Sequence, residues 1–507
     1  MRVSLRVVQL GAIAVVVAVT TYFTFELDRF FIPKELVLHA SALLAALFAI
    51  RTLREATATR IDRLLAGYVG LGVLSALFAT NRWLGLRALA ISASSLLLFW
   101  VARRLREAGY AHALVTALAF AVVAIAVTSL LQTYGLETSL FSENRSPGGT
   151  LGNRNFVAHA AAFGLPLVLL AAIGAQRRFL LGASGAALAT ASLVLTRSRA
   201  AWLAFAAVVV VFLAAMIASP PLRRDGRAWR RLAVIVAFVA LAVGAALVLP
   251  NALHWRGKNP YLQSVRQVTN YESGSGRGRL VQYERSLVMA LHHPLFGAGP
   301  GNWAVDYPAH AARHDPSLSD GDQGMTTNPW PSSDWVDWLA ERGPFAFALI
   351  ALAFVAIAAS GVRQLFAAQT ADDGLAAAAL LATAAGACIA GLFDAVLLLA
   401  LPAFLVWSAM GALLAAPPTR RPLPVVVIVA LLLISAAGAA RSAMQIAAMH
   451  FYDAGAIAHA ARVDPGNYRA QLRLARGGGR TRCEHAQIAR ELYPNAVAAK
   501  QAARGCR

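Results

Sequence analysis

Long apolar runs separated by short polar segments dominate the chain. A helix that crosses a bilayer needs about 20 mostly apolar residues, and such runs recur from Val7 to Ala440. The first run is too long for a removable signal peptide and lacks its small-residue cleavage site, so we count it as a span. The pattern therefore predicts an all-α, polytopic transmembrane bundle of twelve or thirteen spans, near residues 7–25, 36–50, 62–80, 84–102, 111–131, 155–174, 179–196, 200–218, 231–250, 343–360, 374–394, 396–416 and 423–440.

Two long polar segments stand apart from these spans. Residues 251–342 form a loop punctuated by Gly and Pro and rich in Trp and Tyr, whereas residues 441–507 have the pattern of soluble helices. We expect a transmembrane domain over 1–440 that contains the loop, followed by a helical tail. Two tail segments, 461–467 and 489–495, resemble each other, but their prolines are closer than the 34-residue tetratricopeptide period. A degenerate tetratricopeptide-like cap and an unrelated helical tail both remain open.

The charge of the chain predicts its orientation. Charged residues make up only 14% of the sequence, yet the formal net charge is +21, which in a soluble protein would suggest a nucleic-acid partner. If the N-terminus is cytoplasmic, nineteen basic residues lie on cytoplasmic segments and eight on the short opposite loops. This bias is the usual sign of membrane orientation. It predicts that the long loop and the tail are extracytoplasmic, and it removes the nucleic-acid reading.

The three cysteines give little direct evidence of chemistry. Cys388 lies inside an apolar run and fits a small buried residue. Cys483 and Cys506 lie in the tail, where they could form a disulfide if the tail is extracytoplasmic. The chain has no Cys-x-x-Cys pair and no Cys/His ligand pattern, so we expect neither a metal nor another cofactor.

Arginines at the predicted outer face are the first candidates for a binding site. Arg197 and Arg199 stand between two apolar runs with almost no loop between them. A guanidinium at the membrane boundary is costly unless it snorkels to the interface or meets an anion. Simple snorkelling and a phosphate site are both open, because a guanidinium can bind phosphate oxygens in a bidentate manner.

Two further segments add cations to the same face. Residues 273–280 interleave glycines with Arg277 and Arg279, which fits either a backbone that approaches a ligand closely or a solvated surface turn. Residues 147–158 open a span and contain Arg154, with Asn155 and its neighbour Asn153 as candidate helix caps.

The segment before the span at 343–360 combines aromatic and acidic residues. Trp330, Trp335 and Trp338 could form an interfacial aromatic belt or stack on sugar rings. Three acidic residues on the same segment could then serve as hydrogen-bond acceptors or bases: Asp334, Asp337 and Glu341.

In this order, the segments resemble the bacterial O-antigen ligase and polymerase superfamily. Its members are polytopic inner-membrane glycosyltransferases, GT-C-like in architecture, that act on glycans linked to undecaprenyl pyrophosphate. The matching pieces, spread over roughly residues 140–415, are Gly149–Ala158, Ser198–Ala201, Gly278–Leu280, His293–Trp303 and Leu339–Gly343. Each motif is loose alone, but their order and their placement around one large loop are more specific.

The resemblance assigns roles to particular residues. Binding of the lipid pyrophosphate would fall on Arg199 and Arg279, and the remaining candidates for the substrate site are Arg154, Asn155, Arg197, Arg277, Asp334 and Trp335. The family usually carries a His-Asn pair nine residues before the Glu of its Ala-Glu-x-Gly motif, but this chain has Ser332 and Ser333 there. The catalytic base is therefore open among His310, His314, Asp334 and Glu341.

The function implied by the resemblance is metal-independent transfer of a glycan to an acceptor hydroxyl at the periplasmic face of the bacterial inner membrane. The acceptor could be lipid A–core, a growing glycan or a protein, and the tail could dock a protein partner or the chain's own loop. A transporter, or a non-catalytic scaffold of a polysaccharide assembly machine, is the alternative. The missing histidine favours the scaffold, whereas the lack of an internal hydropathy repeat disfavours the transporter.

Overall fold

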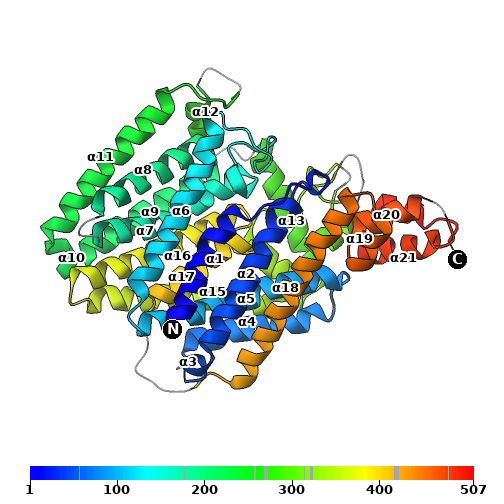
Figure 1. The fold of residues 1–507 in the computed structure, drawn as a ribbon, viewed down its shortest axis with the longest axis horizontal. Helices are drawn as coiled ribbons and strands as arrows, with labels where there is room; N and C mark the ends of the chain where they lie inside the picture. Colours follow the sequence, from blue (N-terminus) through cyan, green and yellow to red (C-terminus); the bar gives the residue numbers. More distant parts are fainter. Residues whose placement is uncertain are drawn as a thin grey trace.

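The computed structural model describes residues 1–55, 58–174, 178–255, 259–267, 272, 274–312, 314–319, 324–415, 422–477 and 479–506. Over these ranges the fold is an all-α bundle without a β-strand, apart from one isolated bridge between Leu318 and Thr326 (Figure 1). This confirms the predicted fold class.

Each predicted span corresponds to one helix. These helices are α1 (Arg2–Val17), α2 (Asp28–Phe48), α4 (Arg60–Ala76), α5 (Arg82–Glu107), α6 (Ala111–Thr133), α7 (Arg154–Gly174), α8 (Phe179–Leu195), α9 (Arg199–Ala218), α11 (Gly226–Val248), α15 (Asp334–Ala367), α16 (Ala371–Phe393), α17 (Ala400–Leu413) and α18 (Val425–Asp453). Within the described ranges, nine are long and apolar enough to cross a membrane: α2, α5, α6, α7, α9, α11, α15, α16 and α18. The other four have only 14 to 17 residues, so the predicted number of full-length spans is too high by this measure.

The short helix α17 shows that an apolar run in the sequence need not be a full-length membrane span. All of its residues, Ala400–Leu413, are buried inside the bundle. A helix surrounded by other helices needs an apolar surface on every side but need not match the bilayer thickness. By contrast, only 11% of the most apolar stretch of α11 is buried, so this helix turns most of its surface outward.

Further helices connect the spans and build the long loop. They are α3 (Ile50–Arg54), α10 (Pro220–Arg224), α12 (Pro260–Arg266), α13 (Gly274–His292) and α14 (Trp303–Asp306), together with the 3₁₀ turns η1 (Phe23–Phe25), η2 (Gly149–Leu151) and η3 (Tyr307–Ala309). The 19 residues of α13 begin inside the glycine-rich segment. This segment is therefore mainly the start of a helix and not a surface turn, although its first residue, Ser273, lies outside the described residues.

Long-range hydrogen bonds fix which helix ends share a face. Arg2 Nε donates to the Tyr110 hydroxyl at 3.2 Å, and Arg106 donates to the Leu413 carbonyl, so the start of α1, the α5–α6 turn and the end of α17 lie together. In Figure 1 these ends lie opposite α12, α13 and the tail. Three of the basic residues that the charge pattern assigns to the cytoplasm, Arg177, Arg420 and Arg421, lie outside the described residues.

The kink in α15 places the long loop. Gly343 has φ 76°, in the left-handed region that favours glycine. A Cβ at this position would lie 2.3 Å from the Leu295 carbonyl oxygen, so the absence of a side chain also permits close packing. Residues 334–342 therefore run in their own direction and pack against the loop that follows α13.

The tail folds as four short helices, α19 (Ile457–Val463), α20 (Tyr468–Arg476), α21 (Arg482–Leu492) and α22 (Val497–Ala502). Cys483 and Cys506 form a disulfide, as considered from the sequence, with their Cα atoms 5.2 Å apart. The tail contacts the chain's own loop, because the Asn495 side-chain amide donates to the Val305 carbonyl at 3.0 Å. The boundary at 440 and the tetratricopeptide-like character of the tail stay predictions.

Candidate functional site

Four arginines from three separate segments of the chain line one polar cavity of about 520 Å³. They come from the starts of α7 and α9, the turn before α9, and the first turns of α13. The cavity is lined by Arg154, Asn155, Arg197, Ser198, Arg199, Ala200, His254, Trp255, Gln263, Ser264, Gln267, Ser275 and Arg279. Five residues that the sequence singled out thus lie together: Arg154, Asn155, Arg197, Arg199 and Arg279.

Arg197 sits at a strained turn between α8 and α9. Its φ of 56° is the only positive value among the described residues other than glycine, and such a conformation is uncommon for a bulky side chain. The guanidinium donates to Ser264 Oγ at 2.9 Å and lies 4.8 Å from the Trp255 ring. Arg154 lies at the same distance from that ring. One indole therefore holds two cations through cation–π contact.

Arg199, from α9, and Arg279, from α13, complete the lining of the cavity. Arg199 donates to the Gln267 carbonyl and, at 2.7 Å, to Ser275 Oγ near the start of α13. Arg279 lies one turn further along α13 and is half-buried. Arg277 is exposed on the same helix and is absent from the cavity wall, so the structure separates it from the other candidate arginines.

The cavity is strongly electropositive. No acidic side chain belongs to the described residues that line it. Burial lowers the pKa of Arg197, against the opposing effect of the nearby Tyr261 phenol, but a guanidinium stays charged at neutral pH. Four guanidinium groups with their many N–H donors suit a ligand with several negatively charged oxygens, such as a diphosphate.

The helix α7 contributes more than its first turn. Asn153 accepts a hydrogen bond from the Asn155 N–H at 3.0 Å and so caps the helix, while Asn155 lines the cavity. One turn later, His159 is 1% exposed, and its Nδ1 lies 3.9 Å from Asp394 Oδ2. The sequence analysis did not single out His159 because an apolar run surrounds it. An ionisable residue inside a span is nevertheless a recognisable signal.

Two acidic candidates bind backbone and lie outside the cavity wall. Asp334 is buried and accepts hydrogen bonds from the N–H groups of Val396 and Leu397 at 2.9 to 3.1 Å. Glu341 is buried too, and its two oxygens accept from the N–H groups of Gly301 at 2.5 Å and Trp303 at 2.7 Å. Asp334 therefore holds the turn between α16 and α17, and Glu341 holds the loop between α13 and α14.

Trp335 and the two serines also take part in the architecture. The Trp335 Nε1 donates to the Cys388 carbonyl at 3.1 Å, and its ring packs edge-to-face against Trp338. Ser333 caps α15 and donates to the Gly391 carbonyl at 3.0 Å. The neighbouring Ser332 carbonyl lies 2.7 Å from the Tyr283 hydroxyl, so the position of the missing histidine faces α13.

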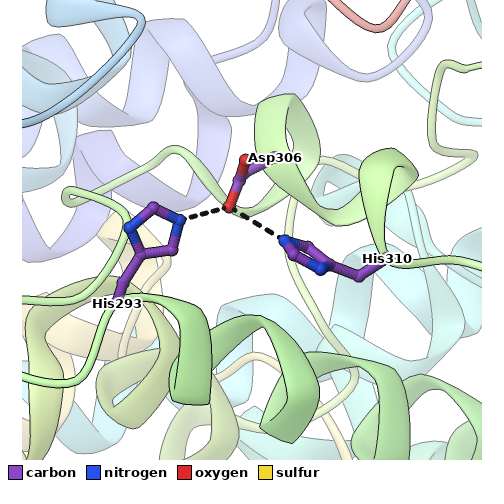
Figure 2. A group of neighbouring side chains, drawn as sticks. All are labelled: His293, Asp306 and His310. Carbon is purple, nitrogen blue, oxygen red and sulfur yellow. Dashed lines mark hydrogen bonds and ion pairs between the residues drawn. The ribbon is translucent and has the colours of Figure 1, made fainter.

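The two histidine candidates of the loop lie apart from the arginine cavity. His314 is exposed. His310 joins His293 around Asp306, with Nε2 to Oδ2 distances of 3.5 Å and 3.0 Å (Figure 2). Burial lowers the pKa of His310, while Asp306 opposes this shift. The donor atoms of these three residues all lie within 4.8 Å of one another, which makes them a group that could hold a metal ion.

The comparisons with known proteins agree with this geometry. The O-antigen ligase family model matches residues 184–351, which include Arg197, Arg199 and Arg279. No curated protein sequence matches the chain. Together with the long apolar helices, the family match indicates a multi-pass membrane protein with an O-antigen-ligase-type function in surface polysaccharide biosynthesis. The match supports the resemblance of this chain to the O-antigen ligase and polymerase superfamily.

Proposed function

We propose that the protein transfers a glycan from undecaprenyl pyrophosphate to an acceptor hydroxyl at the periplasmic face of the bacterial inner membrane. The observation that carries this proposal is that four arginines line one cavity, next to the ends of helices long and apolar enough to cross a membrane. A lipid-linked pyrophosphate has its charge at that depth, with its isoprenoid chain in the bilayer.

In the proposed reaction, the protein stabilises the departing pyrophosphate. Arg199 and Arg279 contact the phosphate oxygens, and Arg154 and Arg197 extend the positive wall. Donors already in place where negative charge develops can supply much of the acceleration, because they need no reorganisation during the reaction. Fixed guanidinium groups can provide this charge, so the proposed transfer is metal-independent.

The proposed orientation places the N-terminus in the cytoplasm, with the long loop, the arginine cavity and the tail in the periplasm. The basic bias of the opposite face supports this orientation. So does the disulfide between Cys483 and Cys506, since disulfides persist in oxidising compartments such as the periplasm.

The acceptor hydroxyl belongs to lipid A–core, to a growing glycan or to a protein, which would make the enzyme a ligase, a polymerase or a protein glycosyltransferase. We propose that the tail, as a tetratricopeptide-like cap, braces the loop through Asn495 and offers its outer surface to a protein partner. A second candidate function, a non-catalytic scaffold, is favoured by Ser332 at the usual histidine position.

Two arginines on α13 provide a matched test. Arg279→Ala should abolish glycan transfer in cells, whereas Arg277→Ala, on the exposed side of the same helix, should keep it. Membrane insertion of both variants is checked by their abundance in the membrane fraction. A wild-type glycan profile with Arg279→Ala would contradict the proposed transfer and favour the scaffold.

A further inference from the structure

We infer that His159, held beside Asp394, is the base that takes the proton from the acceptor hydroxyl, an inference that rests on the glycan transfer proposed above. His159 is 1% exposed, and neither of its ring nitrogens has a hydrogen-bond partner among the described residues. A buried polar group normally finds a partner, so an unsatisfied imidazole inside a membrane bundle calls for an explanation. A substrate hydroxyl at the ring would supply the missing partner.

The position of His159 relates it to the arginine cavity. Residues four apart on a helix lie on the same face, so His159 follows Asn155 down the face of α7 that borders the cavity. The charges that bear on the ring are those of Asp394, from the segment after α16, and of Arg279, from α13. The carboxylate can orient the imidazole, and the arginine links it to the phosphate end of the site.

Three other segments converge beside this pair. Tyr283 lies one turn after Arg279 on α13, and its hydroxyl is 2.7 Å from the carbonyl oxygens of both Ser332 and Leu392. Leu392 is two residues before Asp394. The segment that carries Asp394, the partner of His159, is therefore linked through Tyr283 to Ser332, where the chain lacks a loop histidine.

The step is a substitution at the anomeric carbon. The acceptor oxygen forms the new bond to that carbon while the bond from carbon to the pyrophosphate oxygen breaks. The bonding electron pair leaves with undecaprenyl pyrophosphate, whose new charge is met by the arginines. The hydroxyl proton passes to a ring nitrogen of His159 and is then released to water, which restores the neutral imidazole. Asp394 stabilises the imidazolium in between.

The other candidate bases are less well placed. Both oxygens of Glu341 and of Asp334 accept hydrogen bonds from backbone N–H groups, and His310 contacts Asp306. The real rival is His254, which lines the cavity and is exposed. Among the described residues, no carboxylate lies within ion-pair distance of it, so it serves as a matched comparison for His159.

The experiment compares His159→Gln with His254→Gln in the full-length chain, purified into lipid nanodiscs and supplied with a lipid-linked oligosaccharide donor. A general base contributes about 100- to 10,000-fold. His159→Gln should therefore lower kcat by at least about 100-fold and remove the acidic limb of the pH–rate profile, with little change in KM for the donor. His254→Gln, at a residue that lines the arginine cavity, should act mainly on KM for the donor and should keep the acidic limb of the pH–rate profile.

Asp394→Asn is the second variant, because its side chain is more accessible than His159 and its loss disturbs the bundle less. It should lower kcat while donor binding is kept. Near-normal kcat in both His159→Gln and Asp394→Asn would overturn the inference, as would loss of kcat and of the acidic limb in His254→Gln alone. If Arg279→Ala abolishes transfer in the same assay, only the assignment of the base has failed; if it does not, the proposed transfer has failed.

A separate observation carries a second inference. We propose that His293, Asp306 and His310 bind a divalent transition-metal ion of the zinc class. Both imidazoles direct Nε2 toward the same carboxylate oxygen (Figure 2), at 3.0 Å and 3.5 Å. Neighbouring ligands in a tetrahedral zinc site lie about 3.3 Å apart, since the metal–ligand bonds are about 2.0 Å. The histidine side chains need only small rotations to bring all three donors to this spacing.

The site would join three segments of the loop. His293 directly follows α13, Asp306 ends α14, and His310 directly follows η3. A bound ion would therefore fix the end of the helix whose first turns carry Arg279. Two of the ligand side chains, those of His293 and Asp306, are 40% and 24% exposed, so an ion can enter from solvent and a water can fill the fourth position.

The test measures Zn²⁺ binding by equilibrium dialysis of the full chain in detergent, without a polyhistidine tag. The wild type should bind one ion, and His310→Ala and Asp306→Ala should each weaken binding at least about tenfold. His314→Ala is the matched control from the same loop and should bind as the wild type does. Absence of saturable binding, or equal losses in His310→Ala and His314→Ala, would overturn the site.

Discussion

Glu341 offers a sharp test of whether a motif residue is a base or a structural anchor. Its two oxygens accept hydrogen bonds from the backbone N–H groups of Gly301 and Trp303, in a setting where the side chain is buried. A glutamine at this position can accept at one oxygen only, so one backbone N–H loses its acceptor. Hydrogen bonds to a charged group contribute about 1.5–3 kcal/mol each.

Glu341→Gln should therefore destabilise the folded protein by about 1.5–3 kcal/mol, and Glu341→Ala, which removes both acceptors, by about twice as much. The assay is thermal unfolding in detergent together with the rate of glycan transfer per folded molecule. For Glu341→Gln we expect a lower Tm, a rate above a tenth of the wild-type value, and an unchanged acidic limb of the pH–rate profile.

The control is Glu284→Gln, because this carboxylate is exposed on α13 and should change neither quantity. A general base would behave in the opposite way, with an unchanged Tm and a rate reduced by about 100-fold or more. That outcome for Glu341→Gln would refute the anchoring role.

Three further predictions concern other parts of the structure. Trp255→Ala removes the ring shared by two guanidinium groups and should weaken donor binding by several-fold, measured as KM, since each cation–π contact is worth about 0.5–1 kcal/mol at exposed sites. Cys483→Ser opens the disulfide to Cys506 and should destabilise the tail by about 2–4 kcal/mol, seen as faster proteolysis there while transfer continues. Gly343→Ala places a Cβ against the Leu295 carbonyl oxygen, at a position whose positive φ favours glycine. We therefore expect a lower Tm and reduced activity.

The helices were predictable because the membrane imposes a strong pattern. Each apolar run became one helix, since a run of such residues in lipid must satisfy its own backbone hydrogen bonds. The number of full-length spans was less predictable, because a helix such as α17 is apolar for another reason, namely its burial among other helices. The glycines of residues 274–280 also misled the sequence reading: they belong to a helix whose stability depends on tertiary packing.

Each arginine of the site could be singled out from the sequence, but their proximity at one cavity could not. Arg197 and Arg199 were visible because a cation at a membrane boundary is costly. Their partnership with Arg154, through the shared Trp255, depends on loop geometry that no spacing in the sequence encodes. The acidic residues show the opposite problem. Glu341 is a candidate base by residue type, and the sequence gives no sign that its two oxygens accept hydrogen bonds from the backbone N–H groups of Gly301 and Trp303.

This contrast bears directly on the chemistry. In the part of the chain that the structure describes, two buried acids that the sequence singled out, Asp334 and Glu341, accept hydrogen bonds from backbone N–H groups, while four arginines line the cavity. In the proposed transfer, such a site would stabilise the departing negative charge, and neither Asp334 nor Glu341 would serve as the base. We infer that the proton of the acceptor passes to the imidazole of His159, which lies beside Asp394, is influenced by the charge of Arg279, and has no hydrogen-bond partner for its ring among the described residues. An intact cavity with Asp394→Asn should accordingly bind the donor normally and transfer it slowly, which separates anion binding from proton removal.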